Sequence, residues 1–297
     1  MTPQPSHGDS ASKHTLPPGL YVVATPIGNT GDITLRALEV LRAANVIACE
    51  DTRTTGPFLA RLGVSTALTA YHEHNAARQR PALLARLERG EAVALVSDAG
   101  TPLVSDPGYK LTRAVIDAGH AVIPIPGASA PLAALVASGL PSDRFLFAGF
   151  LPPRAAARTT ALADLAPVAA TLVLFESARR LPETLAAMAE GLGERPAAVC
   201  RELTKLHEEV RRAPLSELAA HYAEAGAPRG EVVIVVGPPA SANAAAPAPE
   251  DLDARLRALL AEGLGTRDAA ARVAVETGLP RRALYQRALA LDGTAAP

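Results

Sequence analysis

The sequence predicts an α/β fold with an open, parallel-rich sheet domain, a mixed-sheet domain and a small helical C-terminal segment. From Gly19 onward, short β-rich runs alternate with Ala-, Leu- and Arg-rich segments of helical periodicity. The run AVALVS at 92–97 is apolar almost throughout, as in a parallel strand that is covered on both faces. Several connections in the second half are short, which favours antiparallel pairing there.

The elements of the first half follow one another in βαβ order. Leu35, Leu38 and Leu41 share one face of a helix expected over 34–44, and Gly90 ends another over 77–90. A third helix is expected over 131–140. Strands are expected at GLYVVAT (19–25), NVIAC (45–49), AVALVS (92–97) and HAVIPI (120–125).

The second half is expected to hold two more helices, over 179–192 and 214–226. Its strands are expected at RFLFAGF (144–150), AATLVLF (169–175), PAAVCREL (196–203), EEVRRA (208–213) and GEVVIVVG (230–237). The pattern as a whole predicts five parts: a disordered tail (1–18), an N-terminal α/β domain (19–138), a C-terminal α/β domain (139–238), a Pro/Ala linker (239–250) and a helical segment (251–297).

The helical segment is expected to contain two or three short helices in a helix-turn-helix-like arrangement. Thr266 would cap one helix, Gly278 would end it and Pro280 would start the next. The stretch between Thr266 and Leu291 contains five Arg and two acidic residues, which leaves an excess of three positive charges. This segment could dock on RNA, or it could be a packing element or dimer brace.

Composition and charge exclude several classes of protein. The net charge of −1 gives no overall signature of nucleic-acid binding. No apolar run reaches membrane-spanning length, and the first 18 residues lack the apolar core of a signal peptide. Cys49 and Cys200 lack metal-ligand spacing and are expected to be buried free thiols. A cytoplasmic protein is therefore expected.

Three turns follow strands of the first half, where open α/β sheets bind ligands. They span 25–34, 97–108 and 124–130. The first turn contains neither G-x-G-x-x-G nor G-K-[ST], which argues against a nicotinamide enzyme and an ATPase. Asp32 and Thr34 in this turn are interpreted mainly as a helix cap.

The second turn, SDAGTPLVSDPG, combines features of a binding loop. Gly100 permits close approach of the backbone, and Pro102 and Pro107 stiffen the chain. The mixture of donors and acceptors suits a zwitterionic ligand with ribose hydroxyls. For Asp106 and Pro107, a tight turn with a helix cap at Asp106 is an equally weighted alternative.

Eight segments in one order carry a resemblance to a known family. They include LYVVATPIGNTGDITLRALEVL, ACEDTRTT, YHEHN, ALVSDAGTPLVSDPGY, FESARRL and CRELTKLHEEV. Over roughly residues 19–291 the chain resembles the ribosomal RNA small subunit methyltransferase I family of the tetrapyrrole methylase superfamily. The resemblance implies S-adenosylmethionine-dependent 2'-O-methylation of a cytidine ribose in the decoding centre of 16S rRNA, by a homodimer.

The resemblance also implies which residues contact S-adenosylmethionine between the two α/β domains. They are Pro26, Ala99, Gly100, Thr101, Val104, Ser129, Ala130, Ser177 and Leu203. Thr101 stands where many tetrapyrrole enzymes have Asp, which leaves open the group that holds the polar end of the donor. No metal is expected.

A ribose hydroxyl is a poor nucleophile at neutral pH, so a general base is expected. Glu50 and Asp98 are the candidates, with a helix N-cap as the alternative for Glu50 and its neighbour Asp51. His72 and His74, two residues apart, would share one face of a strand and suit a metal, but exposed loop histidines are the favoured interpretation. Glu176, in an apolar context, is expected to have a specific partner, such as a substrate group or a buried Arg.

Candidate RNA contacts are the cationic or imidazole side chains that could meet phosphates, although each could equally be an ordinary surface group. They are Arg53, His72, Arg180, Arg281 and Arg282. Two other functions compete with rRNA methylation: a tetrapyrrole or cobalamin-pathway methyltransferase on the same fold, and a non-catalytic ribosome-assembly factor that binds the same ligand.

Overall fold

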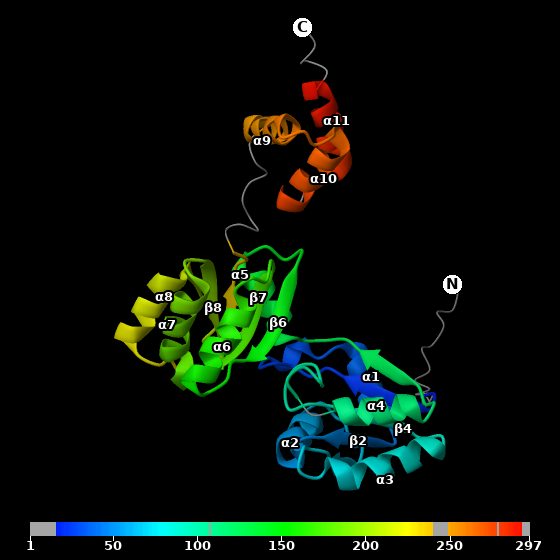
Figure 1. Cartoon of the computed structure of the whole chain (residues 1–297). Coiled ribbons are helices and arrows are strands. Elements are labelled where there is room, and N and C mark those ends of the chain that lie inside the picture. Colours follow the sequence, from blue (N-terminus) through cyan, green and yellow to red (C-terminus); the bar gives the residue numbers. More distant parts are fainter. Residues whose placement is uncertain (1–15, 107, 240–248, 278, 293–297) are drawn as a thin grey trace, which may run out of the picture. The chain divides into compact units, whose positions relative to one another are not determined.

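The computed structural model describes residues 16–106, 108–239, 249–277 and 279–292 (Figure 1). The chain divides into two compact units, Met1–Gly237 and Pro238–Pro297. Residues 1–15 of the expected disordered tail, residues 240–248 of the expected Pro/Ala linker, Pro107 and Gly278 lie outside the described residues. The domain boundary between residues 138 and 139 stays a prediction.

The first sheet is wholly parallel, with the strand order β3-β2-β4-β1-β5. Successive residues of β4 point to opposite faces, and this alternation separates two cores. Ala92 and Ala94 pack with α1 and α2, whereas Val93 and Leu95 pack with α3 and α4. The bounds are β1 Gly19–Val23, β2 Val46–Cys49, β3 Leu68–Ala70, β4 Ala92–Leu95, β5 Val122–Ile125, α1 Leu35–Ala43, α2 Thr52–Arg61, α3 Ala76–Glu88 and α4 Tyr109–Asp117, with the 3₁₀ turn η1 at Thr30–Asp32.

The second sheet is mixed, with the strand order β6-β7-β10-β8-β9. Only β6 and β7 run parallel, and the other neighbours pair antiparallel as the short connections predict. The bounds are β6 Phe145–Phe150, β7 Thr171–Ser177, β8 Pro196–Arg201, β9 Glu209–Pro214, β10 Glu231–Val236, α6 Ala155–Leu165, α7 Leu181–Leu192 and α8 Leu215–Ala225, with η2 at Ala178–Arg180.

Helix α5 (Ala130–Ser138) joins the two sheets. It follows the last strand of the first sheet, but its buried Ala134 and Leu135 pack against Val173, Ala198 and Val233 of the second. Helices α6, α7 and α8 cover the opposite face of that sheet. The turn before α5 therefore lies where the two sheets meet.

Helix starts follow local capping chemistry. The Thr34 hydroxyl accepts the Ala37 N–H at 3.1 Å, and the Asp51 carboxylate accepts the Arg53 N–H at 2.8 Å, as the capping alternatives for these residues predict. Asp106, by contrast, caps no helix: the N-cap of α4 is Gly108. The capping part of that alternative was therefore wrong, because Asp106 precedes the N-cap residue of α4 by two positions.

The second unit is a three-helix cluster, as the sequence predicts. It contains α9 (Pro249–Ala261), α10 (Thr266–Thr277) and α11 (Arg281–Asp292). Leu256, Leu259, Val273 and Leu284 form its own core. None of the described helices is long and apolar enough to cross a membrane.

Candidate active site

A cavity of about 450 Å³, here called the main cavity, opens where the turns of the first sheet meet the second sheet. Carboxyl ends of parallel strands bring loops from distant parts of the sequence to one place. The lining residues are Ile27, Ala99, Gly100, Thr101, Val104, Ser105, Asp106, Ser129, Ala130, Pro131, Phe150, Phe175, Glu176, Ser177, Ala178, Cys200, Leu203, Gly230, Glu231, Val232 and Val233.

The structure brings together all but one of the predicted S-adenosylmethionine contacts in this cavity. Those present are Ala99, Gly100, Thr101, Val104, Ser129, Ala130, Ser177 and Leu203. Pro26 lines a neighbouring cavity instead. The sequence reasoning missed the apolar wall from Phe150, Phe175 and Val233, because buried strand residues look the same whether they face a core or a ligand.

The turn after β4 is held rigidly against the end of β1. Thr25 and Gly100 exchange backbone hydrogen bonds of 2.8 and 3.1 Å. The Ser97 hydroxyl donates to the carbonyls of Ala99 and Gly100, and the Thr101 hydroxyl donates to Ala128. Gly100 has φ +77°, and a Cβ there would lie 3.3 Å from Ile27 Cγ2. A larger residue would be strained here.

The next part of the same loop places a carboxyl in the cavity wall. Leu103 and Ser105 adopt positive φ angles of 73° and 62°, which non-glycine residues rarely do. Partial burial, together with the negative charges of Glu50 and Asp98, raises the pKa of Asp106 to about 6, against a hydrogen bond from Ser97 that lowers it. Asp106 thus titrates near neutrality, as groups in functional sites often do.

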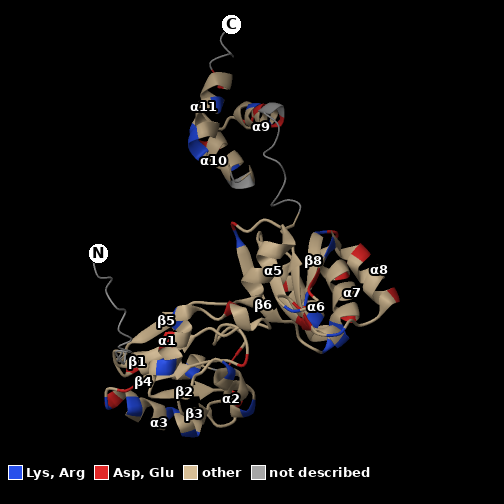
Figure 2. Ribbon diagram, turned by 180° about the vertical axis from the view of Figure 1, so that it is seen from behind, with Lys and Arg blue, Asp and Glu red and all other residues tan. Residues whose placement is uncertain are grey.

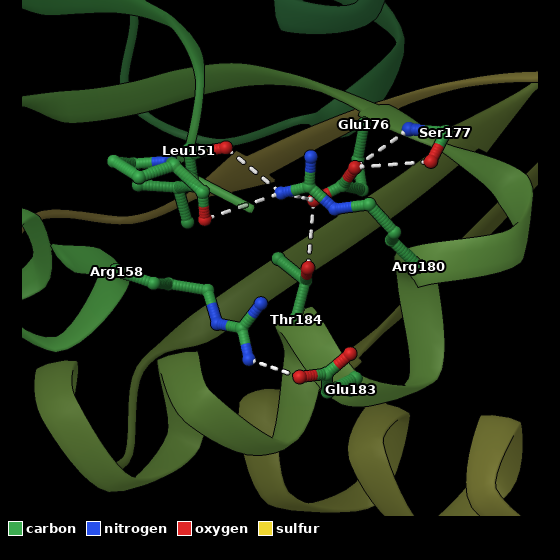
Figure 3. A network of polar contacts seen from close by, with 8 residues as sticks. Leu151, Arg158, Glu176, Ser177, Arg180, Glu183 and Thr184 are labelled. Carbon is green, nitrogen blue, oxygen red and sulfur yellow. Dashed lines mark hydrogen bonds and ion pairs between the residues drawn. The ribbon is translucent and has the colours of Figure 1, made fainter. Parts of the chain in front are cut away.

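A buried ionic network supports the opposite wall (Figure 3). The side chain of Glu176 is 1% exposed and pairs with Arg180 at 3.2 Å. It also accepts the Thr184 hydroxyl at 2.6 Å and the Ser177 N–H at 2.7 Å. Arg180 donates in turn to the carbonyl of Leu151. The network ties the ends of β6 and β7 together beside the cavity.

The expected specific partner of Glu176 is therefore an arginine, the half-buried Arg180. This guanidinium, a candidate RNA contact, is largely engaged by structural partners. A further arginine in the same view, Arg158, is buried and paired with Glu183 (Figure 3).

The two cysteines are buried free thiols, as expected. Cys200 lines the main cavity, but burial raises the pKa of its thiol to about 11. The neutral thiol form therefore dominates at pH 7, and a thiolate nucleophile is not available there.

The candidate general bases occupy different places. Asp98 is exposed, and one of its carboxylate oxygens accepts the Asp51 N–H at 3.3 Å. It lines a second cavity of about 310 Å³, which shares Ile27, Ala99 and Glu231 with the main cavity. Glu50 lines neither of these cavities, but its charge acts on Asp106.

His72 and His74 lie in a loop, as the favoured interpretation predicts, and not on one face of a strand. Strand β3, which was not predicted, ends at Ala70, and both residues lie in the turn before α3, with ring centroids 6.1 Å apart. Asn75 closes this turn: its side chain accepts the His72 N–H and donates to the Ala70 carbonyl. Within the described ranges, no cluster of His, Cys, Asp or Glu could hold a metal.

The remaining RNA candidates are exposed. The guanidinium of Arg53 pairs with Asp51 at 2.7 Å, and hydrogen bonds from Arg53 hold the Asp51 pKa at about 2. Arg281 and Arg282 are exposed at the start of α11. Figure 2 shows Lys and Arg, in blue, on α10 and α11 of the second unit.

Two family models match this chain. Residues 19–219 match the model described as "Tetrapyrrole (Corrin/Porphyrin) Methylases", and residues 246–292 match the "RsmI C-terminal HTH domain". The second match covers the three-helix unit, so the expected helix-turn-helix likeness is confirmed.

Known proteins resemble the chain over most of its length. Ribosomal RNA small subunit methyltransferase I of Mesorhizobium japonicum is 57% identical over 280 residues, which cover 94% of each chain. A uroporphyrin-III-C-methyltransferase from Thermus thermophilus is 27% identical with a TM-score of 0.53, covering 73% of this chain and 93% of the other. A second structure of such an enzyme from the same organism, in complex with S-adenosyl homocysteine, is 21% identical with a TM-score of 0.52. The match covers 74% of this chain and 97% of the other.

Proposed function

Because the chain belongs to the ribosomal RNA small subunit methyltransferase I family, we propose that it methylates the 2'-oxygen of a cytidine ribose in the decoding centre of 16S rRNA. S-adenosylmethionine is the methyl donor of this family. The observation that carries the proposal is the 57% identity over 94% of both chains, together with the matched C-terminal unit.

The main cavity fits such a donor. Its 450 Å³ lies within the range of small-molecule sites, about 300–1,000 Å³. The N-terminus of α5, at Ser129 and Ala130, favours a carboxylate, while the carboxyls of Asp106 and Glu231 suit an ammonium or sulfonium. Apolar lining from residues such as Phe150 and Val233 suits an adenine ring.

The residues predicted from the family resemblance would hold the donor as follows. Ala99, Gly100 and Thr101 offer backbone groups from a rigid turn, and Val104, Ser177 and Leu203 contribute from both sides of the cavity. Pro26 would act from the neighbouring cavity, where it stiffens the end of β1.

Bound S-adenosylmethionine supplies a methyl group on a sulfonium that is ready to leave as a neutral thioether. The chain has to hold the ribose hydroxyl in line behind that methyl carbon, which is a positioning task. As the O–C bond forms and the C–S bond breaks, the hydroxyl proton needs an acceptor. Asp98 is the better placed candidate, because it lines the second cavity next to Ala99, which lines both cavities, and Glu50 is the second candidate.

The proposed partners are the small ribosomal subunit and a second copy of the chain, in the cytoplasm. Four exposed or half-exposed side chains are proposed to contact phosphates: Arg53, His72, Arg281 and Arg282. Arg180 is proposed to contact a phosphate only with the part of its guanidinium that Glu176 does not engage. The basic excess on α10 and α11 supports a docking role for the second unit.

Mapping ribose methylation on 16S rRNA from cells with and without this protein tests the proposal. We expect one cytidine to lose its methyl group in the absence of the protein. Label transfer from S-adenosylmethionine to undermethylated small subunits, but not to a porphyrinoid, should follow with purified protein. Transfer to the porphyrinoid alone would favour the tetrapyrrole alternative, and donor binding without any transfer would favour the assembly factor.

The general base is tested separately. Asp98→Ala should reduce turnover about 100-fold or more while donor affinity persists, as expected for loss of a proton acceptor. Full turnover in both Asp98→Ala and Glu50→Ala, with folding and donor binding verified, would overturn the assignment.

A further inference from the structure

The second cavity is large enough for a ligand of its own. Its volume of about 310 Å³ reaches the lower end of the range for ligand sites, about 300 Å³. It shares Ile27, Ala99 and Glu231 with the main cavity, so a group bound in one lies against a wall of the other. Donor and acceptor of a transferred group need this arrangement.

One wall of the second cavity is a face of helix α2. Thr54, Phe58 and Arg61 all line the cavity, and their spacing of four and three residues places them on one side of the helix. Phe58 is half-buried against the core under the first sheet, which limits the movement of its ring. An aromatic ring held at a cavity wall is a platform on which a nucleobase can stack.

Two cations with different surroundings line the same cavity. The ammonium of Lys205 is fixed by Glu202 at 2.8 Å and Glu231 at 2.9 Å. Its chain lies so close to Gly28 that a Cβ there would be 2.4 Å from Lys205 Cγ. Arg61 is exposed and forms no ion pair or hydrogen bond with any described residue. Its guanidinium is therefore free to bind a phosphate.

An acidic side chain completes the lining. Asp98 is exposed and lines the second cavity beside Ala99, at the wall shared with the main cavity. The cavity thus combines an aromatic ring, a free guanidinium and a carboxylate near the donor. These groups match the base, the phosphate and the ribose hydroxyl of a single nucleotide.

We propose that the second cavity holds one unstacked nucleotide of the RNA substrate, with its base on Phe58, its phosphate on Arg61 and its ribose toward Asp98. This assignment rests on the proposed function and deepens it. It makes Phe58 and Arg61 substrate-binding residues, and it requires the acceptor nucleotide to leave the stack before methyl transfer.

Substitutions of Phe58 test the stacking. Phe58→Leu keeps an apolar side chain but removes the ring, and it should raise the KM for undermethylated small subunits about tenfold. Phe58→Tyr keeps the ring and should restore a KM close to that of the unaltered protein. The Kd for S-adenosylhomocysteine, measured by calorimetry, should not change in either variant.

Arg61→Ala tests the phosphate contact independently of the core. It should raise the KM for undermethylated small subunits several-fold. It should also reduce the slope of log binding constant against log salt concentration by about the amount that one phosphate contact contributes. Arg113→Ala is the matched control, because Arg113 is an exposed helical arginine that pairs with Asp117 outside both cavities.

Each outcome has one meaning. A KM unchanged in both Phe58→Leu and Arg61→Ala overturns the nucleotide site while the unaltered protein still methylates subunits. A parallel rise of KM and of the S-adenosylhomocysteine Kd in Phe58→Leu, with Arg61→Ala unaffected, also overturns it, because Phe58 would then act only through the fold. An unaltered protein that transfers no methyl group to subunits refutes the proposed function itself.

Discussion

At the scale of single residues, the site depends on carboxyls whose surroundings differ. Asp51 caps a helix and is held ionised by Arg53, whereas Asp106 sits in the cavity wall and titrates near pH 6. Glu176 is almost fully buried but has an arginine and two further hydrogen-bond donors. The same functional group therefore serves as a cap, a titrating wall residue and a structural anchor.

Asp106 makes stability depend on pH. Its folded pKa of about 6 exceeds the usual 3.8, so the folded protein binds this proton more tightly than the unfolded chain does. The resulting stability is fully present below about pH 4 and is lost as the pH rises through about 6. Asp106→Asn should abolish this dependence and raise the free energy of unfolding at pH 7 by about 1 kcal/mol, a value reduced because the carboxyl is half exposed.

Urea unfolding of the unaltered protein and Asp106→Asn at pH 4.5, 6 and 7 measures this effect. Asp117→Asn, an exposed substitution on α4, serves as the control. Parallel stability profiles for the unaltered protein and Asp106→Asn would contradict the prediction.

Glu176 is predicted to stabilise the cavity wall through its partners. Glu176→Ala leaves Arg180 and Thr184 without their buried acceptor and should lower the free energy of unfolding by about 3 kcal/mol. The Kd for S-adenosylhomocysteine should also rise, because Ser177 lines the main cavity. Both values for Glu176→Gln should lie between those of the unaltered protein and Glu176→Ala. Glu190→Ala, an exposed substitution on α7, should change neither quantity. An unaltered ligand affinity in a folded Glu176→Ala variant would remove the positioning role.

At the scale of elements, α5 links the fold to the site. Its N-terminus borders the main cavity, and its buried face packs on the second sheet. The helix was predicted from its apolar pattern over 131–140, but the pattern does not say which sheet receives it. Helices α2, α4 and α6 were not predicted; of these, only α2 contains Gly or Pro, at Gly56 and Pro57. One of them, α2, provides a wall of the second cavity.

Overpacking of α5 should disturb the main cavity. Ala134 is fully buried against the second sheet, so Ala134→Leu adds methyl groups to a filled space and should lower the free energy of unfolding by about 2 kcal/mol. The N-terminus of α5 should shift and weaken S-adenosylhomocysteine binding. Val136→Leu is the control, since Val136 is 81% exposed. Equal ligand affinity and stability in the two variants would refute this role of α5.

At the scale of the whole molecule, the chain forms two compact units, and we propose that the first performs the chemistry and the second docks on RNA. Each unit has its own hydrophobic core, and the lining residues of both cavities belong to the first. The second unit contributes a local excess of basic residues that the net charge of −1 conceals. This division predicts that substrate affinity and donor affinity can be separated.

A chain that ends at Gly237 should fold and bind S-adenosylhomocysteine with unchanged affinity, because its cores and the main cavity remain intact. Its affinity for small subunits should fall about tenfold or more, with a weaker salt dependence, since phosphate contacts are lost. Calorimetry and filter binding measure the two affinities. Undiminished subunit affinity would show that the second unit is instead a packing element.

The sequence by itself determined the fold class and every described strand except β3, and the family resemblance pointed to eight residues that line the main cavity. Apolar alternation and Gly/Pro turns are local signals, and eight ordered segments identify the family. Only the tertiary structure decided that Arg180 is the partner of Glu176, that Asp106 lies in a cavity wall, and that Phe58 and Arg61 face a second cavity. Such facts depend on which distant segments meet, because burial and charge at a site are sums over neighbours that no local pattern contains.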